Sequence, residues 1–131
     1  MVTLATAGIA RADVCAPVSI GWAVYPRIAS LAADDGNLYW LRDAATCGGG
    51  VEIVRTPKSG GASQVLTSFA NVDEIAAAAG TVYARVGAAI YAFSVGAPGN
   101  VRTVVADDGT ATRGELAADA GGVYFAESIV G

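Results

Sequence analysis

A ten-residue pattern that occurs three times constrains the fold of this chain more than any other feature. It reads LAADDGNLYW at residues 31–40, IAAAAGTVYA at 75–84 and LAADAGGVYF at 116–125, and the three copies align without gaps. Their starts lie 44 and 41 residues apart. A period of this length indicates stacked supersecondary units and is too long for a leucine-rich repeat. The sequence therefore predicts a repeat architecture.

Each copy of the pattern predicts a β-hairpin. An aliphatic-Ala-Ala strand runs into a tight turn, and a second strand then carries a tyrosine. The small alanines suit innermost strands that converge on a narrow axis, because they let neighbouring sheets approach closely. The turn glycines are Gly36, Gly80 and Gly121, and the tyrosines are Tyr39, Tyr83 and Tyr124.

Two further strands are expected in each of the first two units. The third strand is predicted at 51–57 and 89–95, and the fourth at 63–67 and 101–105. Gly87 and Ala88 form a plausible two-residue hairpin turn, and turn-rich stretches at 58–61 and 96–100 precede the fourth strands. Four short antiparallel strands per period are typical of a propeller blade. The predicted fold is all-β, with four-stranded antiparallel blades in an incomplete propeller of about two and a half blades.

The first unit resembles the blades of bacterial six-bladed β-propellers of the YWTD and TolB-like kind. In that family a strand ending in Tyr-Trp precedes an Arg-x-Pro-x-x-Gly-Gly turn and a Val-Leu strand. Here the corresponding segments are Leu-Tyr-Trp at 38–40, Arg-Thr-Pro-Lys-Ser-Gly-Gly at 55–61 and Val-Leu at 65–66. The resemblance covers roughly residues 28–126 and implies the fold more than a function. The chain departs from the family because Leu41 and Arg42 replace the Thr-Asp pair, and only the first unit keeps the tryptophan.

The repeat also divides the chain. Residues 28–70 are expected to form the first blade, 71–112 the second and 113–131 the first half of a third. Residues 13–27 would be outer strand or strands of a preceding or terminal blade, and residues 1–12 a signal-peptide remnant or disordered tail. A propeller needs about 4 to 8 blades. We therefore expect a fragment of a longer product, or else a protomer that closes a ring with its own copies as a homo-oligomer.

Composition excludes several functions. The chain of 131 residues has no histidine, which removes histidine-based zinc sites and Ser-His-Asp triads. Its net charge is −4 with scattered basic residues, so nucleic acid is not an expected partner. Apolar residues make up 53% of it, which excludes a disordered chain. No apolar run approaches the about 18 residues of a membrane-spanning helix.

The first residues leave the location of the protein open. Residues 2–12 are small and apolar and end in Ala-Arg-Ala, the form of a signal-peptidase site, but a basic region before them is missing. They are either the remainder of an export signal or a plain strand or tail. Export to the periplasm or the medium is the prediction. In that case Cys15 and Cys47 are expected to form a disulfide, and otherwise to be buried thiols.

Two sets of residues are candidates for function. Asp34 and Asp119 occupy the same position of the repeat, where a hard cation such as calcium could bind, although aspartate is also a common turn residue. The expected loop at 42–50, which includes Arg42 and Asp43, is the best candidate for a binding loop. If Cys15 and Cys47 form a disulfide, the disulfide would instead restrain that loop.

The expected function is that of a non-catalytic binding or scaffolding module, which presents loops to a protein or glycan partner and uses no cofactor. This function requires no residue type that is missing from the chain. The alternative is part of a propeller hydrolase of the lactonase kind. Its divalent-cation site would need ligands from other blades, since the carboxylates here are few.

Overall fold

The computed structural model describes residues 30–44, 50–109 and 111–129. These residues form ten strands and no helix, so the all-β prediction is confirmed. The strands make three antiparallel sheets of four, four and two strands, each in chain order, and none of these sheets closes on itself. Accordingly, the described residues include no helix capable of crossing a membrane.

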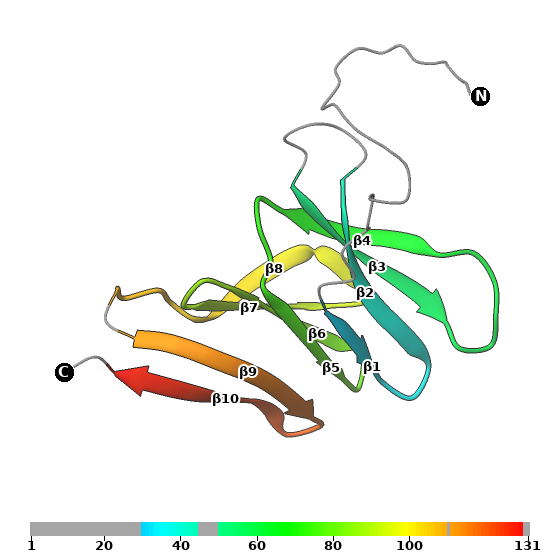
Figure 1. The fold of residues 1–131 in the computed structure, drawn as a ribbon. Helices are drawn as coiled ribbons and strands as arrows, with labels where there is room; N and C mark the ends of the chain where they lie inside the picture. The colour runs from blue at the N-terminus through cyan, green and yellow to red at the C-terminus, as the bar shows by residue number, and fades with distance from the viewer. Residues whose placement is uncertain (1–29, 45–49, 110, 130–131) are drawn as a thin grey trace, which may run out of the picture.

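The sheets follow one another along the chain (Figure 1). The first contains β1 (Leu31–Ala33), β2 (Asn37–Asp43), β3 (Val51–Pro57) and β4 (Gln64–Phe69). The second contains β5 (Glu74–Ala78), β6 (Thr81–Val86), β7 (Ala89–Ser94) and β8 (Ala97–Val105). The third is the pair β9 (Ala111–Asp119) and β10 (Gly122–Ile129). The first strand of the second sheet, β5, contacts both β1 and β9.

The three copies of the sequence pattern form three hairpins with one pairing register. The first residue of each copy lies opposite the tenth: Leu31 pairs with Trp40, Ile75 with Ala84, and Leu116 with Phe125. The alanine after it pairs with the tyrosine in every copy. Identical register places the equivalent side chains of the three hairpins on the same face of their sheets.

The tight turns agree with the local sequence. Gly87 has φ of 60° and sits between paired Val86 and Ala89, as expected for a two-residue turn that begins with glycine. The β5–β6 turn has positive φ at both central residues, Ala79 at 50° and Gly80 at 78°. Ala79 is the described non-glycine residue with positive φ, and its Cβ makes that conformation costly.

Strand ends differ from the sequence prediction by one or two residues in β4 and β7, and in β2 and β8 the strand takes in residues expected to lie in a loop or turn. β2 continues through Arg42 and Asp43, which pair with Glu52 and Val51, so the loop that was expected from residue 42 begins later. β8 begins at Ala97 and takes in most of the stretch 96–100, which was expected to be a turn. In both cases pairing with the neighbouring strand overrides the local composition, and bulges between β7 and β8 absorb the irregular residues.

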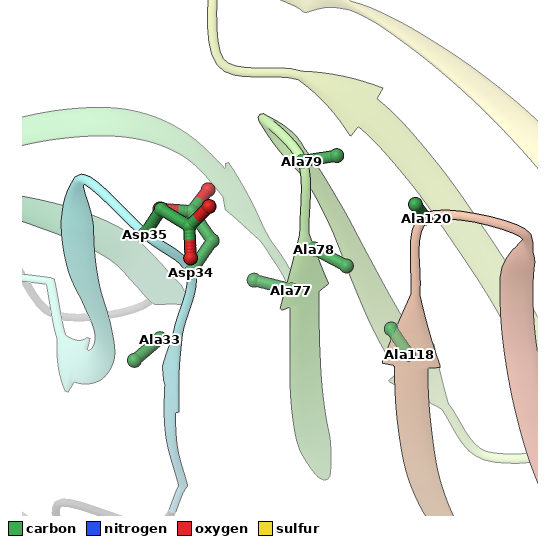
Figure 2. A pocket seen from close by; sticks show the side chains of 8 residues that line it. All are labelled: Ala33, Asp34, Asp35, Ala77, Ala78, Ala79, Ala118 and Ala120. Atoms are coloured by element: carbon green, nitrogen blue, oxygen red, sulfur yellow. The ribbon is translucent and has the colours of Figure 1, made fainter.

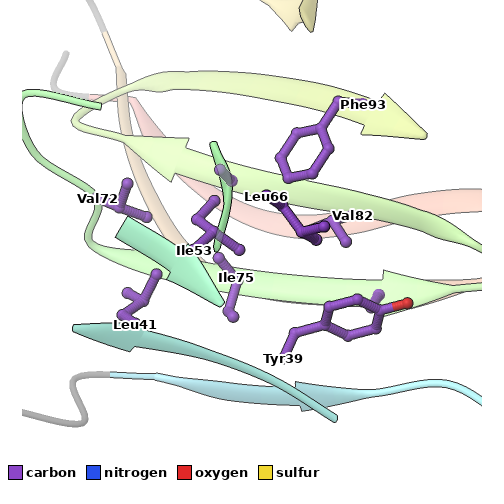
Figure 3. Packing of buried hydrophobic residues seen from close by; sticks show 10 residues of the cluster. Tyr39, Leu41, Ile53, Leu66, Val72, Ile75, Val82 and Phe93 are labelled. Atoms are coloured by element: carbon purple, nitrogen blue, oxygen red, sulfur yellow. The ribbon is translucent and has the colours of Figure 1, made fainter. Parts of the chain in front are cut away.

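Successive sheets pack through opposite faces. The tyrosine face of the first sheet lies on the aliphatic face of the second (Figure 3), where Tyr39 is 0% exposed. The tyrosine face of the second sheet lies in turn on the aliphatic face of the third. The first cluster contains Tyr39, Leu41, Ile53, Leu66, Val72, Ile75, Ala77, Val82, Ala84 and Phe93. The second contains Tyr83, Ile90 and Ala92, with Leu116, Ala118, Val123 and Phe125 packed against them.

A side chain just before the repeat pattern bridges each pair of sheets. The Ser30 hydroxyl accepts a hydrogen bond from the Ile75 N–H at 3.1 Å. One repeat later, the Glu74 carboxylate accepts one from the Leu116 N–H at 2.6 Å. Ser30 and Glu74 hold equivalent positions, so the two sheet contacts share this polar bridge as well as the pairing of a tyrosine face with an aliphatic face.

Several sequence predictions lie outside the described residues. These are the signal-peptide remnant or tail at 1–12, the outer strand or strands at 13–27, and both Cys15 and Cys47. Their proposed roles stay predictions.

Candidate functional site

The turns of the three hairpins meet at one end of the sheets and line an open hollow of about 300 Å³. Figure 2 shows the lining residues, which come from the ends of β1, β5 and β9 and from the turns that follow these strands. They are Ala33, Asp34, Asp35, Ala77, Ala78, Ala79, Ala118 and Ala120. Because every copy of the pattern has alanine at its third position, near the end of the first strand, most of the wall is small and apolar, with two neighbouring carboxylates on one side.

Asp34 is the most heavily hydrogen-bonded of these residues. Its Oδ1 accepts from the backbone N–H groups of Gly36 at 3.0 Å and Asn37 at 2.9 Å, which closes the β1–β2 turn. Its Oδ2 accepts from the Tyr39 hydroxyl at 2.8 Å and from the Gly80 N–H at 3.1 Å. The last bond crosses to the second sheet, so Asp34 forms a turn and joins two sheets.

The cross-sheet bond depends on a difference between the repeats. In the third hairpin, Asp119 Oδ1 accepts from the N–H of Gly121 at 2.7 Å, as Asp34 does from Gly36. The second hairpin has Ala78 at this position. Its Gly80 N–H therefore lacks an aspartate in its own turn, and Asp34 of the neighbouring sheet supplies the acceptor.

The same contacts set the protonation of this cluster. Burial by itself would raise the pKa of Asp34, but the hydrogen bonds from Tyr39, Asn37, Gly36 and Gly80 favour the carboxylate and lower its pKa below the usual value. Burial and the hydrogen bond to the Asp34 carboxylate raise the pKa of Tyr39 to about 12. Asp34 is thus an anion and Tyr39 a neutral donor at physiological pH.

Asp119 and Tyr124 form the equivalent pair in the third hairpin, but both side chains are exposed to solvent. The Tyr124 hydroxyl lies 3.3 Å and 3.2 Å from the two Asp119 carboxylate oxygens. The hydrogen bond to Asp119 raises the pKa of Tyr124. Tyr124 is 57% exposed, whereas Tyr39 is fully buried and Tyr83 is 8% exposed.

The predicted calcium ligands are therefore both used as hydrogen-bond acceptors within their own turns. Four donors already occupy the Asp34 carboxylate, and Asp119 accepts from two backbone N–H groups and from Tyr124. Within residues 30–44, 50–109 and 111–129, no cluster of three or more metal-ligating side chains occurs. Among the hollow's carboxylates, Asp35 is exposed and has no side-chain partner in the described part of the chain.

The predicted binding-loop residues lie in a strand, at the other end of β2 from the hollow. Arg42 forms an ion pair with Glu52 at 2.7 Å, and its guanidinium lies 5.9 Å from the centre of the Trp40 ring. Asp43 is the exposed last residue of β2. The loop that follows, at 45–49, is outside the described residues, so its role in binding stays a prediction.

Arg113 is a buried polar residue that the sequence reasoning missed. Its guanidinium donates to the Ala88 carbonyl at 2.6 Å, pairs with Glu127 at 2.8 Å and lies over the Phe125 ring. It ties the β9–β10 hairpin to the β6–β7 turn. No signal in the repeat marks it, because it lies outside the ten-residue pattern.

Comparison with known proteins does not supply a family: no family model, no curated protein and no solved structure matches this chain.

Proposed function

We propose that this chain is a non-catalytic binding and scaffolding module, made of successive propeller-like blades, whose turn end takes up a group from a protein partner. The observation that carries the proposal is the convergence of three equivalent turns on one hollow of about 300 Å³. Rigid sheets hold these turns, and turns and loops on a rigid scaffold are where binding residues commonly lie.

The blade assignment is supported by how the sheets contact each other. Both contacts use a tyrosine face against an aliphatic face, and in both the side chain before the pattern accepts a hydrogen bond from a backbone N–H of the next sheet. A repeated contact of one kind rotates each sheet by a similar step relative to the last, which is the arrangement of blades around an axis.

The chemistry of the hollow favours a basic group. Asp34 is held as an anion by its hydrogen bonds, Asp35 beside it is exposed, and none of the described residues that line the hollow is basic. A lysine or arginine side chain of a protein partner can place its apolar stem along the alanines and its charge at Asp35. Apart from Asp34 and Asp35, the described residues that line the hollow are all alanines, so the two carboxylates have no serine, cysteine or lysine beside them there, which favours binding over catalysis.

Binding is tested with short peptides that carry one central lysine or arginine, compared with their norleucine analogues and with neutral oligosaccharides. The readout is isothermal titration calorimetry, together with two-dimensional NMR of the labelled chain. We expect the basic peptides to shift the amide signals of Gly36, Gly80 and Ala120 and to bind the Asp35→Asn variant at least about tenfold more weakly, as for loss of a charged contact.

Asp43→Asn is the matched control, because it removes one exposed carboxylate at the other end of β2. Binding that is lost in Asp43→Asn and kept in Asp35→Asn would move the site to the loop end of the sheet. Equal binding of the norleucine peptides would refute a basic ligand, and binding of oligosaccharides alone would make the partner a glycan.

A further inference from the structure

The two outermost sheet faces of the described chain match the two halves of its internal contacts. The third sheet leaves its tyrosine face open, and there Tyr124 is 57% exposed. The first sheet leaves its aliphatic face exposed at two edge residues, Leu31 at 58% and Val65 at 40%, whereas Val54 in the middle of the same face is 1% exposed. The residues equivalent to Tyr124 and Leu31 inside the chain, Tyr83 and Ile75, are buried at 8% and 3%.

The open face of the first sheet closely resembles a face that is already covered. Register places Leu31, Ala33, Leu38 and Trp40 on it, in the positions that Leu116, Ala118, Val123 and Phe125 hold in the third sheet. Those four residues of the third sheet pack on the tyrosine face of the second. Both sets are two aliphatic residues, an alanine and an aromatic residue, so the open face has the composition of a proven partner for a tyrosine face.

The third repeat also has a residue, Glu115, at the position that forms the polar bridge between sheets in the first two repeats. Glu115 stands immediately before the third pattern, where Ser30 and Glu74 stand before the first and second. Ser30 and Glu74 accept the backbone N–H of the first pattern residue of the next sheet. Glu115 is exposed and has no side-chain partner among the described residues.

We infer that a second copy of this chain docks head to tail, with its Leu31 face on the Tyr124 face and its Leu31 N–H donating to Glu115. The contact continues the pattern that joins the first sheet to the second and the second to the third. It is heterologous, because each copy uses one face as donor and the other as acceptor, so association can close a ring or extend. It does not require the turn-end hollow to bind anything.

Head-to-tail docking is tested with two variants that each block one face. Leu31→Arg places a charge on the aliphatic face, and Tyr124→Arg places one on the tyrosine face. Both residues are more than half exposed, so neither change disturbs the cores between the sheets. The mass of each protein is measured by sedimentation velocity and light scattering over a range of concentrations, with circular dichroism to confirm the fold.

We expect the unaltered chain to form assemblies larger than its 13.0 kDa monomer, and each variant alone to be a monomer. An equimolar mixture of the two variants should form a 1:1 complex, because each retains the face that the other lacks. Val101→Arg is the control, since Val101 is a 38% exposed residue of β8 in the second sheet and belongs to neither open face. It should associate like the unaltered chain.

The bridge is tested with Glu115→Ala, which should weaken association by about tenfold, whereas Glu115→Gln keeps an acceptor and should weaken it less. A monomeric unaltered chain at high concentration would overturn the inference. Association that survives both arginine variants would place the contact elsewhere and also overturn it. A mixture that stays monomeric would refute the head-to-tail geometry. None of these results bears on peptide binding at the hollow, which is measured on the monomeric variants.

Discussion

Replacing Tyr39 with phenylalanine removes one hydroxyl from a buried contact and leaves the ring in place. The hydroxyl donates to the Asp34 carboxylate at 2.8 Å, and the side chain is fully buried. Hydrogen bonds to charged groups contribute about 1.5 to 3 kcal/mol. Asp34 would keep its three backbone donors, so we expect a loss near the lower end, about 2 kcal/mol of the free energy of unfolding.

The repeat supplies a matched control for this change. Tyr124→Phe removes the same hydroxyl from the same kind of Asp–Tyr pair, but at a position that is 57% exposed, and should cost less than about 0.5 kcal/mol. Urea unfolding at pH 7 of dilute, monomeric protein measures both. If both variants lost the same free energy of unfolding, the buried Asp34–Tyr39 hydrogen bond would contribute no more than the exposed one. The claim that burial strengthens this bond would then be wrong.

Tyr39→Phe should also change how the free energy of unfolding depends on pH. The pKa of Tyr39 is raised to about 12 from an ordinary value of 10.0, so the folded state holds its proton more tightly than the unfolded chain does. Stability from this group is complete below pH 10 and is lost as the pH rises from 10 towards 12, by about 3 kcal/mol for two pKa units. Tyr39→Phe should lack this component of alkaline destabilisation. An unchanged slope of stability against pH in that window would contradict the assignment.

Three further changes test other features of the structure. Ala79→Gly should stabilise the chain by up to about 1 kcal/mol in urea unfolding, because Ala79 has φ of 50° and glycine adopts that conformation without a Cβ clash; a loss of stability would show that the turn is not strained. Gly50→Ala should destabilise the chain by more than about 3 kcal/mol, since a Cβ there would overlap the Phe69 carbonyl oxygen at a φ of 78°; a change in melting temperature of less than a few degrees would contradict this. Calcium should leave the melting temperature unchanged, because Asp34 and Asp119 are occupied as acceptors; a calcium-dependent rise that Asp34→Ala and Asp119→Ala abolish would instead support the hydrolase-type cation site.

Local turn chemistry made much of the strand pattern predictable from sequence. The third strand of the first sheet was expected at 51–57, and β3 spans Val51–Pro57. The glycine at 87 fixed the β6–β7 turn, because few residues other than glycine accept its positive φ. The ends of β2 and β8 were not predictable in the same way, since they depend on the partner strand and not on local composition.

The candidate site was only partly predictable. Alignment of the repeats placed Asp34 and Asp119 at equivalent turns, and the turn-forming role is what their hydrogen bonds show. The bond from Gly80 to Asp34 was missed, although the sequence contains its cause: Ala78 replaces the aspartate that would otherwise bind that N–H. The bridges through Ser30 and Glu74 are not predictable from the repeat, because the ten-residue pattern begins one residue after each of them and serine and glutamate differ at that position.

The positions that vary between the three copies are therefore as informative as those that recur. In each turn the backbone N–H of the pattern's glycine donates to an aspartate carboxylate, and that aspartate can belong to the same hairpin or to the neighbouring sheet. With aspartate in both hairpins, each turn is satisfied by itself and the two sheets are joined by apolar packing and the preceding bridge alone. With Ala78 in the second hairpin, Asp34 serves both turns, so the first and second sheets are joined by one additional charged hydrogen bond. The third hairpin satisfies its own turn through Asp119, and it meets the second sheet through Glu74 and Arg113 instead. A single difference between the repeats can thus decide which sheet supplies the acceptor for a turn without changing the pairing register of either hairpin.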